Sequence, residues 1–123
     1  MTNADFKKEL EQRTKRFAVS VLDWLDTLPD RRTVNALVYQ LAKSGPSMGA
    51  NYREANKAES KDDFSHKISI VEKESNETVF WFEVLLASRL LSAEQKVTGK
   101  ALHAEAVELL KLFSSISRSS RSR

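Results

Sequence analysis

Apolar or small residues recur between positions 64 and 85 at alternating spacings of four and three residues. The repeat consists of Phe64, Ile68, Val71, Ser75, Thr78, Phe82 and Leu85. A helix with this period buries one seam against a neighbouring helix. Because the seam narrows to Ser75 and Thr78 at its middle, we expect that neighbour to approach closely there.

The stretch from residue 40 to 55, QLAKSGPSMGANYREA, has the composition expected of that neighbour. Six small or polar residues fall where a packed helix would normally carry leucine: Ser44, Gly45, Ser47, Gly49, Ala50 and Asn51. Two helices that both narrow can come close together, and a polar contact between them would fix their register. Pro46 lies inside this helix, so we expect a kink or a local break near Gly45.

Capping and breaking residues divide the chain into four helices. Pro29 ends the first, Asp30 is the expected N-cap of the second, and Ser60 with Asp63 caps the third. The predicted ranges are 4–28, 31–58, 61–91 and 99–117. They predict one all-α domain over residues 1–117, an antiparallel up-down-up-down four-helix bundle. For the basic Ser/Arg tail, residues 118–123, we expect disorder.

The chain has no cysteine, which excludes a disulfide framework, a thiolate zinc site and a cysteine nucleophile. Its N-terminal segment, MTNADFKKELEQRTKR, lacks the apolar core of a signal peptide, and no apolar run is long enough to span a bilayer. At 123 residues, a single domain can bury a core without help from metal or disulfides. We therefore expect a soluble cytoplasmic protein with no membrane partner.

The net charge of +3 comes from the C-terminal tail. Three of the 20 basic residues lie in the last six positions, and without them 17 basic residues face 17 acidic ones. Residues 1–57 hold 10 basic and 7 acidic residues, whereas residues 58–117 hold 7 and 10. This uneven distribution of charge would allow a neighbouring molecule to pack with its basic half against the acidic half of this one. It would equally allow the basic half to bind nucleic acid.

Basic residues gather around the two termini of the helix predicted over 31–58 and in the tail. The candidate nucleic-acid-binding residues are Arg31, Arg32, Arg53, Lys57, Lys61, Arg118, Arg121 and Arg123. Such clusters bind phosphates without sequence preference, with a strength that falls as salt rises. The aromatic residues Trp24 and Trp81 lie on stripes predicted to be buried, so we expect them in the core.

A polar set on the two central helices is the candidate structural network. It comprises Asn51, Glu54, Lys67, Glu74 and Glu77. Antiparallel helices joined near Glu59 would bring the Asn51–Glu54 region opposite Lys67, and a buried ion pair with an amide partner would fix register. The functional alternative is a ligand or partner site at one end of the bundle.

Catalysis has little support. A di-iron carboxylate bundle requires Glu-x-x-His on two helices, and the nearest matches are Asp63-x-x-His66 and Glu74-x-x-Glu77. The second histidine, His103, has no such pattern around it, and no glycine spacing matches a phosphate loop or a dinucleotide fold. We expect a protein that is not an enzyme and holds neither metal nor cofactor.

The stretch QLAKSGPSMGANYREA, a Glu-Ser-Lys turn and DFSHKISIVEKESNETVFW together resemble the bacterial four helix bundle protein family. That family includes proteins encoded in intervening sequences of large-subunit ribosomal RNA genes, and the accessory variability determinant of diversity-generating retroelements has a similar fold. The resemblance is densest over residues 37–91. It maps the family's asparagine-glutamate and lysine-glutamate motifs onto the polar set above, with Ala55 where the family often has glycine.

Proteins of this kind form ring-like homopentamers, so the resemblance implies a homo-oligomer. The segment VFWFEVLL is apolar on more than one side, which also favours a second buried surface. The leading hypothesis is an oligomeric module that binds nucleic acid or a ribonucleoprotein partner. The alternative is a homo-oligomeric protein-interaction scaffold without affinity for nucleic acid.

Overall fold

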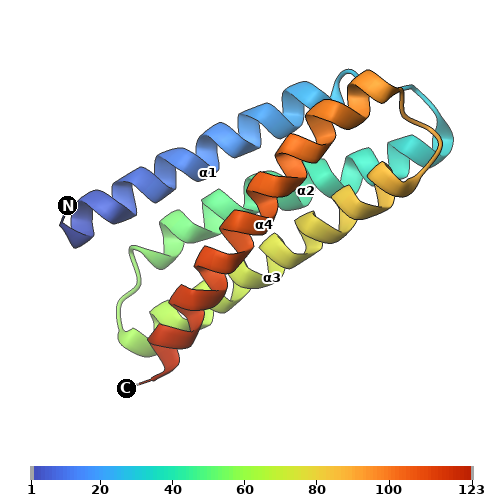
Figure 1. Ribbon diagram of the computed structural model, residues 1–123. Helices are drawn as coiled ribbons and strands as arrows, with labels where there is room; N and C mark the ends of the chain where they lie inside the picture. Colours follow the sequence, from blue (N-terminus) through green and yellow to red (C-terminus); the bar gives the residue numbers. More distant parts are fainter. Residues whose placement is uncertain (1, 123) are drawn as a thin grey trace.

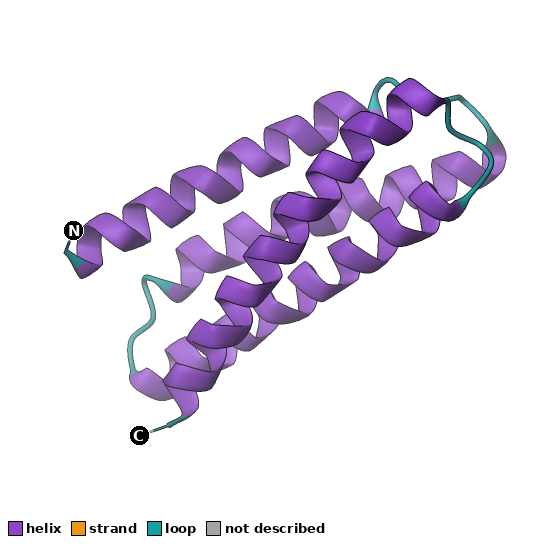
Figure 2. Ribbon diagram, in the orientation of Figure 1, coloured by secondary structure: helices purple, strands orange, loops and turns teal. Residues whose placement is uncertain are grey.

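The computed structural model describes residues 2–122, which form four helices and no strand. These are α1 (Asn3–Leu25), α2 (Arg32–Ala55), α3 (Lys61–Ala87) and α4 (Ala93–Arg121). Consecutive helices run antiparallel and are joined by short connections (Figures 1 and 2), and α4 returns to contact α1. The predicted all-α four-helix bundle is confirmed.

The predicted seam of α3 forms the centre of the core. Ile68, Val71, Ser75, Thr78, Phe82 and Leu85 are all fully buried, and Phe64 at the start of the repeat is half-buried. Phe82 stacks on Trp24 of α1, with ring centroids 5.4 Å apart. Burial of an aliphatic or aromatic side chain stabilises a fold by about 1.5–3 kcal/mol. The apolar seam therefore supplies much of the energy that holds α3 in place.

The close approach predicted between α2 and α3 occurs at Ser44 and Thr78. Both side chains are buried, and their hydroxyls are hydrogen-bonded to each other with Oγ and Oγ1 2.9 Å apart. The Thr78 hydroxyl also donates to the carbonyl oxygen of Glu74 at 2.8 Å. A directional bond inside an apolar seam is satisfied in one register, so it fixes how the two helices align.

The second helix differs from expectation at its start, at its middle and at its end, which is Ala55 rather than residue 58. Its N-cap is Arg31, which makes no side-chain capping bond, whereas Asp30 accepts a hydrogen bond from Asn35 Nδ2 at 2.9 Å. The local break expected near Gly45 does not occur. Instead, α2 continues through Pro46. A proline inside a helix removes one backbone donor. Buried residues before and after Pro46 pack against both neighbouring helices, which holds the helix together.

The fourth helix is longer than predicted at both ends. It begins at Ala93 rather than near residue 99, because Ser92 and Gln95 form a capping box. Gly99 lies inside the helix, where a Cβ atom would come within 2.6 Å of Trp24 Cζ2. The third helix correspondingly ends at Ala87 rather than Leu91, and its predicted cap, Ser60, accepts from the amide of Asp63.

The C-terminal segment expected to be disordered is helical as far as Arg121. Arg121 Nη1 donates to the buried Ser117 hydroxyl at 2.7 Å, and the Ser120 hydroxyl bonds to Ser65 Oγ of α3 at 3.0 Å. These contacts attach the last turn to the bundle, which composition alone did not reveal.

Candidate nucleic-acid interface

The predicted basic residues divide between the two ends of the bundle. Because the helices alternate in direction, both termini and the α2–α3 connection lie at one end, and the α1–α2 and α3–α4 connections lie at the other (Figure 1). Arg31 and Arg32 lie at the second end. The residues near the termini are Arg53, Lys57, Lys61, Arg118 and Arg121; Arg123 lies outside the described residues. All seven described residues are exposed.

One exposed face of α2 connects these two ends. Four residues at spacings of seven, four and seven share it, and Lys57 follows in the turn after the helix. We call this set the α2 stripe: Arg32, Tyr39, Lys43, Ala50 and Lys57, all exposed. The helix has 24 residues and so is about 36 Å long. Tyr39 and Lys43 were absent from the predicted set, although the periodicity of helix two would have identified them.

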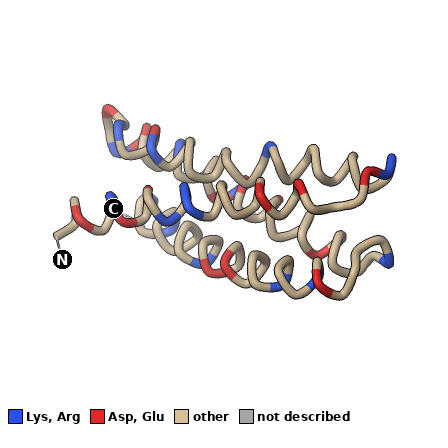
Figure 3. Tube along the Cα trace, turned by 90° about the horizontal axis from the view of Figure 1, so that it is seen from above, with Lys and Arg blue, Asp and Glu red and all other residues tan. Residues whose placement is uncertain are grey.

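The cations of the α2 stripe have few partners within the molecule. Across residues 2–122, none of Arg32, Lys43 and Lys57 forms an ion pair. Arg53 lies beside the stripe, with its Nε 3.9 Å from Glu11 Oε1 of α1. Basic and acidic residues occur on every helix (Figure 3), and the exposed Glu54 lies on the same face as the stripe, between Ala50 and Lys57, so the stripe carries three cations and one acid.

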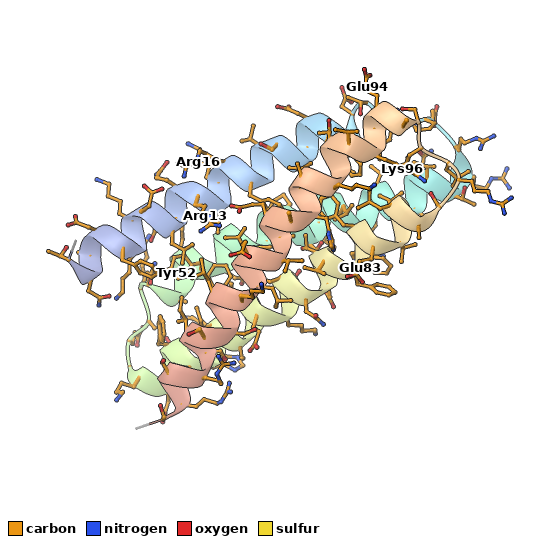
Figure 4. The ribbon with its side chains drawn as sticks, in the orientation of Figure 1. Arg13, Arg16, Tyr52, Glu83, Glu94 and Lys96 are labelled. Carbon is orange, nitrogen blue, oxygen red and sulfur yellow. The ribbon has the colours of Figure 1, made fainter. Side chains whose placement is uncertain are left out.

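A polar cluster joins α1 and α2 near the termini. Asn56 Nδ2 donates to Glu11 Oε2 at 2.9 Å, while Asn56 Oδ1 is buried and has no hydrogen-bond partner within residues 2–122. Burial raises the pKa of the neighbouring Tyr52, and the Asn56 side chain opposes this shift. Figure 4 shows Tyr52 inside the bundle. This cluster, rather than the predicted one, connects the end of α2 to another helix.

The five residues of the predicted structural network do not bond to one another. Asn51 Nδ2 donates to the carbonyl oxygen of Ser47 in its own helix, Lys67 pairs with Asp63 at 3.0 Å, and Glu54 is exposed. Burial and, to a lesser degree, the charge of Glu77 raise the pKa of Glu74, while nearby lysines oppose the shift. In the single chain, Asn51 and Lys67 therefore bond within their own helices, and the five residues form no shared network.

A cleft of about 560 Å³ lies at the end that carries the termini. It opens between the start of α1, the α2–α3 connection and the end of α4. Lys7 and Lys61 supply positive charge, Glu59 supplies negative charge, and Phe64 and Ile116 contribute apolar surface. Its mixed lining makes it less basic than the α2 stripe.

The histidines lie apart from any cluster of ligating side chains. Within residues 2–122 no three His, Cys, Asp or Glu side chains come together to hold a metal ion. His66 is exposed, and His103 Nε2 lies 3.4 Å from Glu83 Oε2. None of the described helices combines the length and the hydropathy required to cross a membrane.

Comparison with known proteins identifies the family. A family model described as 23S rRNA-intervening sequence protein matches residues 7–115. The chain belongs to this family. The resemblance drawn from residues 37–91 is thereby confirmed and extends over most of the chain.

A solved relative has the same fold. It is a protein with unknown function from the S23 ribosomal protein family of Bacteroides thetaiotaomicron VPI-5482, known from its crystal structure. The two chains share 33% sequence identity with a TM-score of 0.75, over 87% of this chain and 96% of the relative. No functionally curated protein matches the chain.

Proposed function

We propose that this protein is a non-enzymatic, cytoplasmic homo-oligomer that binds RNA, alone or within a ribonucleoprotein, along the α2 stripe. The observation that carries the proposal is the stripe itself: exposed cations follow the length of one helix and have no ion-pair partner among the described residues. Unpaired cations on one face attract the phosphate backbone of a nucleic acid. The family description, which refers to intervening sequences of 23S rRNA, supports RNA as the ligand.

Exposed apolar residues on α3 and α4 support self-association. Phe80 is 53% exposed and Val97 is 70% exposed, and Trp81 beside Phe80 is only half-buried. The resemblance to ring-forming proteins implies five copies. A ring displays the α2 stripe once per copy, so individually weak phosphate contacts add through multivalency.

The alternative is a homo-oligomeric scaffold without affinity for nucleic acid. The same exposed apolar residues favour it, together with the equal numbers of acidic and basic residues outside the tail. In that case the cations of one copy would face the acidic residues of the next.

A salt titration distinguishes the two. After light scattering has fixed the oligomer mass, binding to a structured RNA and a DNA duplex is measured for the full chain and for a chain ending at Ser117. The titration is then repeated with two matched variants, in each of which three exposed cations are replaced by glutamine. One changes Arg32, Lys43 and Lys57 of the stripe, and the control changes Lys73, Lys100 and Lys111 of α3 and α4.

We expect the stripe variant to bind RNA more weakly, with a slope of log K against log salt smaller by about 0.7–0.9 for each lost phosphate contact. The control variant and the shortened chain should bind as the full chain does. If both variants bind RNA equally weakly, binding depends on net charge and not on the α2 stripe. Loss of binding only in the shortened chain would assign it to the tail, and no binding by an intact oligomer would favour the scaffold.

A further inference from the structure

Two aromatic side chains project into solvent from the middle of a helix. Tyr39 of α2 is 65% exposed and Phe80 of α3 is 53% exposed. The core aromatic side chains are buried to 3% exposure or less: Phe17, Trp24, Tyr52, Phe82 and Phe113. Tyr39 therefore contributes little to the core. Its exposed ring leaves apolar surface in contact with water.

The two exposed rings lie in opposite electrostatic surroundings. Lys43 follows Tyr39 by one helical turn, and Arg32 precedes it by two turns on the same face. Phe80 instead has Glu77 three residues before it and Glu83 three residues after it. Phosphate is therefore attracted to the surroundings of Tyr39 and repelled from those of Phe80.

The positions beside Tyr39 leave room for a flat ligand. Its neighbours at three residues before and after are Ala36 and Ala42, the first exposed and the second half-buried. Alanine side chains end at Cβ, so neither covers the tyrosine ring. Glu74 of α3 lies within electrostatic reach of Lys43 and partly offsets its charge, whereas Arg32 has no ion pair among the described residues.

We propose that Tyr39 is a stacking platform for an unpaired base of the RNA, with Arg32 and Lys43 contacting the backbone phosphates on either side. This inference rests on the proposed function and specifies its ligand as RNA with a single-stranded segment. Bases inside an A-form duplex are stacked on one another and unavailable to a side chain, whereas unpaired bases stack on exposed aromatic rings.

The test compares Tyr39→Ala, Tyr39→Phe and Phe6→Ala, the last at a ring of α1 that is 38% exposed, with the unchanged full chain. The probes are a fluorescently labelled 12-nucleotide oligouridylate and a 12-base-pair RNA duplex. We expect Tyr39→Ala to bind the single strand about 5- to 140-fold more weakly, with the salt slope unchanged. Tyr39→Phe, which keeps the ring, should retain the affinity, and Phe6→Ala should bind as the unchanged chain does. Duplex binding should not respond to Tyr39→Ala.

Each remaining outcome has a definite meaning. If the unchanged chain binds neither probe, the proposed function fails and the stacking site fails with it. If it binds both probes but Tyr39→Ala weakens neither, RNA binding stands and the platform is overturned. A smaller oligomer mass for Tyr39→Ala, with helix content preserved by circular dichroism, would assign the ring to a subunit contact and also overturn the platform.

Discussion

The α2–α3 seam and the α1–α4 seam hold the same bundle together by different means. At the middle of the α2–α3 seam the contact residues are small and fully enclosed, and Ser44 and Thr78 meet in a buried hydrogen bond. Between α1 and α4, Trp24 packs against Gly99 at one end, and a polar contact near the surface lies farther along. Arg13 makes a two-pronged ion pair with Glu105, at 2.7 and 2.8 Å, in which each side chain remains 32% exposed.

The second seam is also more open. Figure 1 shows α1 and α4 diverging toward the termini, and Figure 4 shows Arg13 on α1 in the space facing α4. At the other end of the seam, Trp24 Nε1 donates to the carbonyl oxygen of Gln95 at 2.9 Å, and Gln95 Nε2 donates to that of Thr27 at 2.7 Å. Water can replace such contacts, whereas it cannot enter the enclosed seam. The two seams should therefore differ in how they tolerate substitution.

The largest expected difference is in added volume. Ser44→Leu replaces the hydroxyl by three carbons in the enclosed seam and also removes the bond to Thr78, so it should lower the free energy of unfolding by about 2–4 kcal/mol. Ser20→Leu, at an exposed position of α1 beside α4, should change it by no more than about 0.5 kcal/mol. Urea unfolding, monitored by circular dichroism, measures the free energy of unfolding of both variants. Similar losses for the two variants would contradict the distinction between the seams.

A smaller effect is expected from removing one buried hydroxyl. Thr78→Val leaves the buried Ser44 hydroxyl without this partner and should cost about 1–3 kcal/mol. The double variant Ser44→Ala with Thr78→Val should cost less than the two single changes together, because no hydroxyl is then left unsatisfied. Thr98→Val, at an exposed position on α4, is the control. Additive losses in the double variant would show that the hydrogen bond does not couple the helices.

The smallest effect is expected at the ion pair of the open seam. The carboxylate of Glu105 raises the pKa of Arg13, but both side chains are partly solvated, so Arg13→Ala should cost less than about 1 kcal/mol. The loss should shrink further at 1 M salt, where charges are screened beyond about 3 Å. Thermal unfolding at low and high salt measures it. A cost above that of Thr78→Val would reverse the ranking of the seams.

The central hairpin was predictable in detail because local and long-range signals agree there. The period of residues 64–85 identified the face that α3 buries, and the small residues of α2 indicated where it approaches. Ser92 and Gln95 also carry a capping signal, but the glycine at position 99 favours a helix boundary there. Glycine is instead required inside α4 because a Cβ atom would collide with Trp24, a contact between segments 75 residues apart.

The candidate site was predicted only in outline. Arg32 and Lys57 were identified as cations, and their spacing places them on one face of α2, but whether that face is exposed depends on the rotation of α2 about its axis. In the same arrangement, Asn51 Nδ2 bonds to a carbonyl oxygen of its own helix, and Asn56 lies against Glu11 of α1. The exposure of Tyr39 depends on the positions of α1 and α3.

By itself the sequence determined the number of helices, their alternating direction and the residues of the main seam. Periodicity, caps and short connections are local properties, so they are readable without a structure. Tertiary structure decided which polar groups meet, where α4 ends, and whether the face of α2 that carries Tyr39 is exposed. These depend on helix rotation and spacing, which are set by many side chains packing at once.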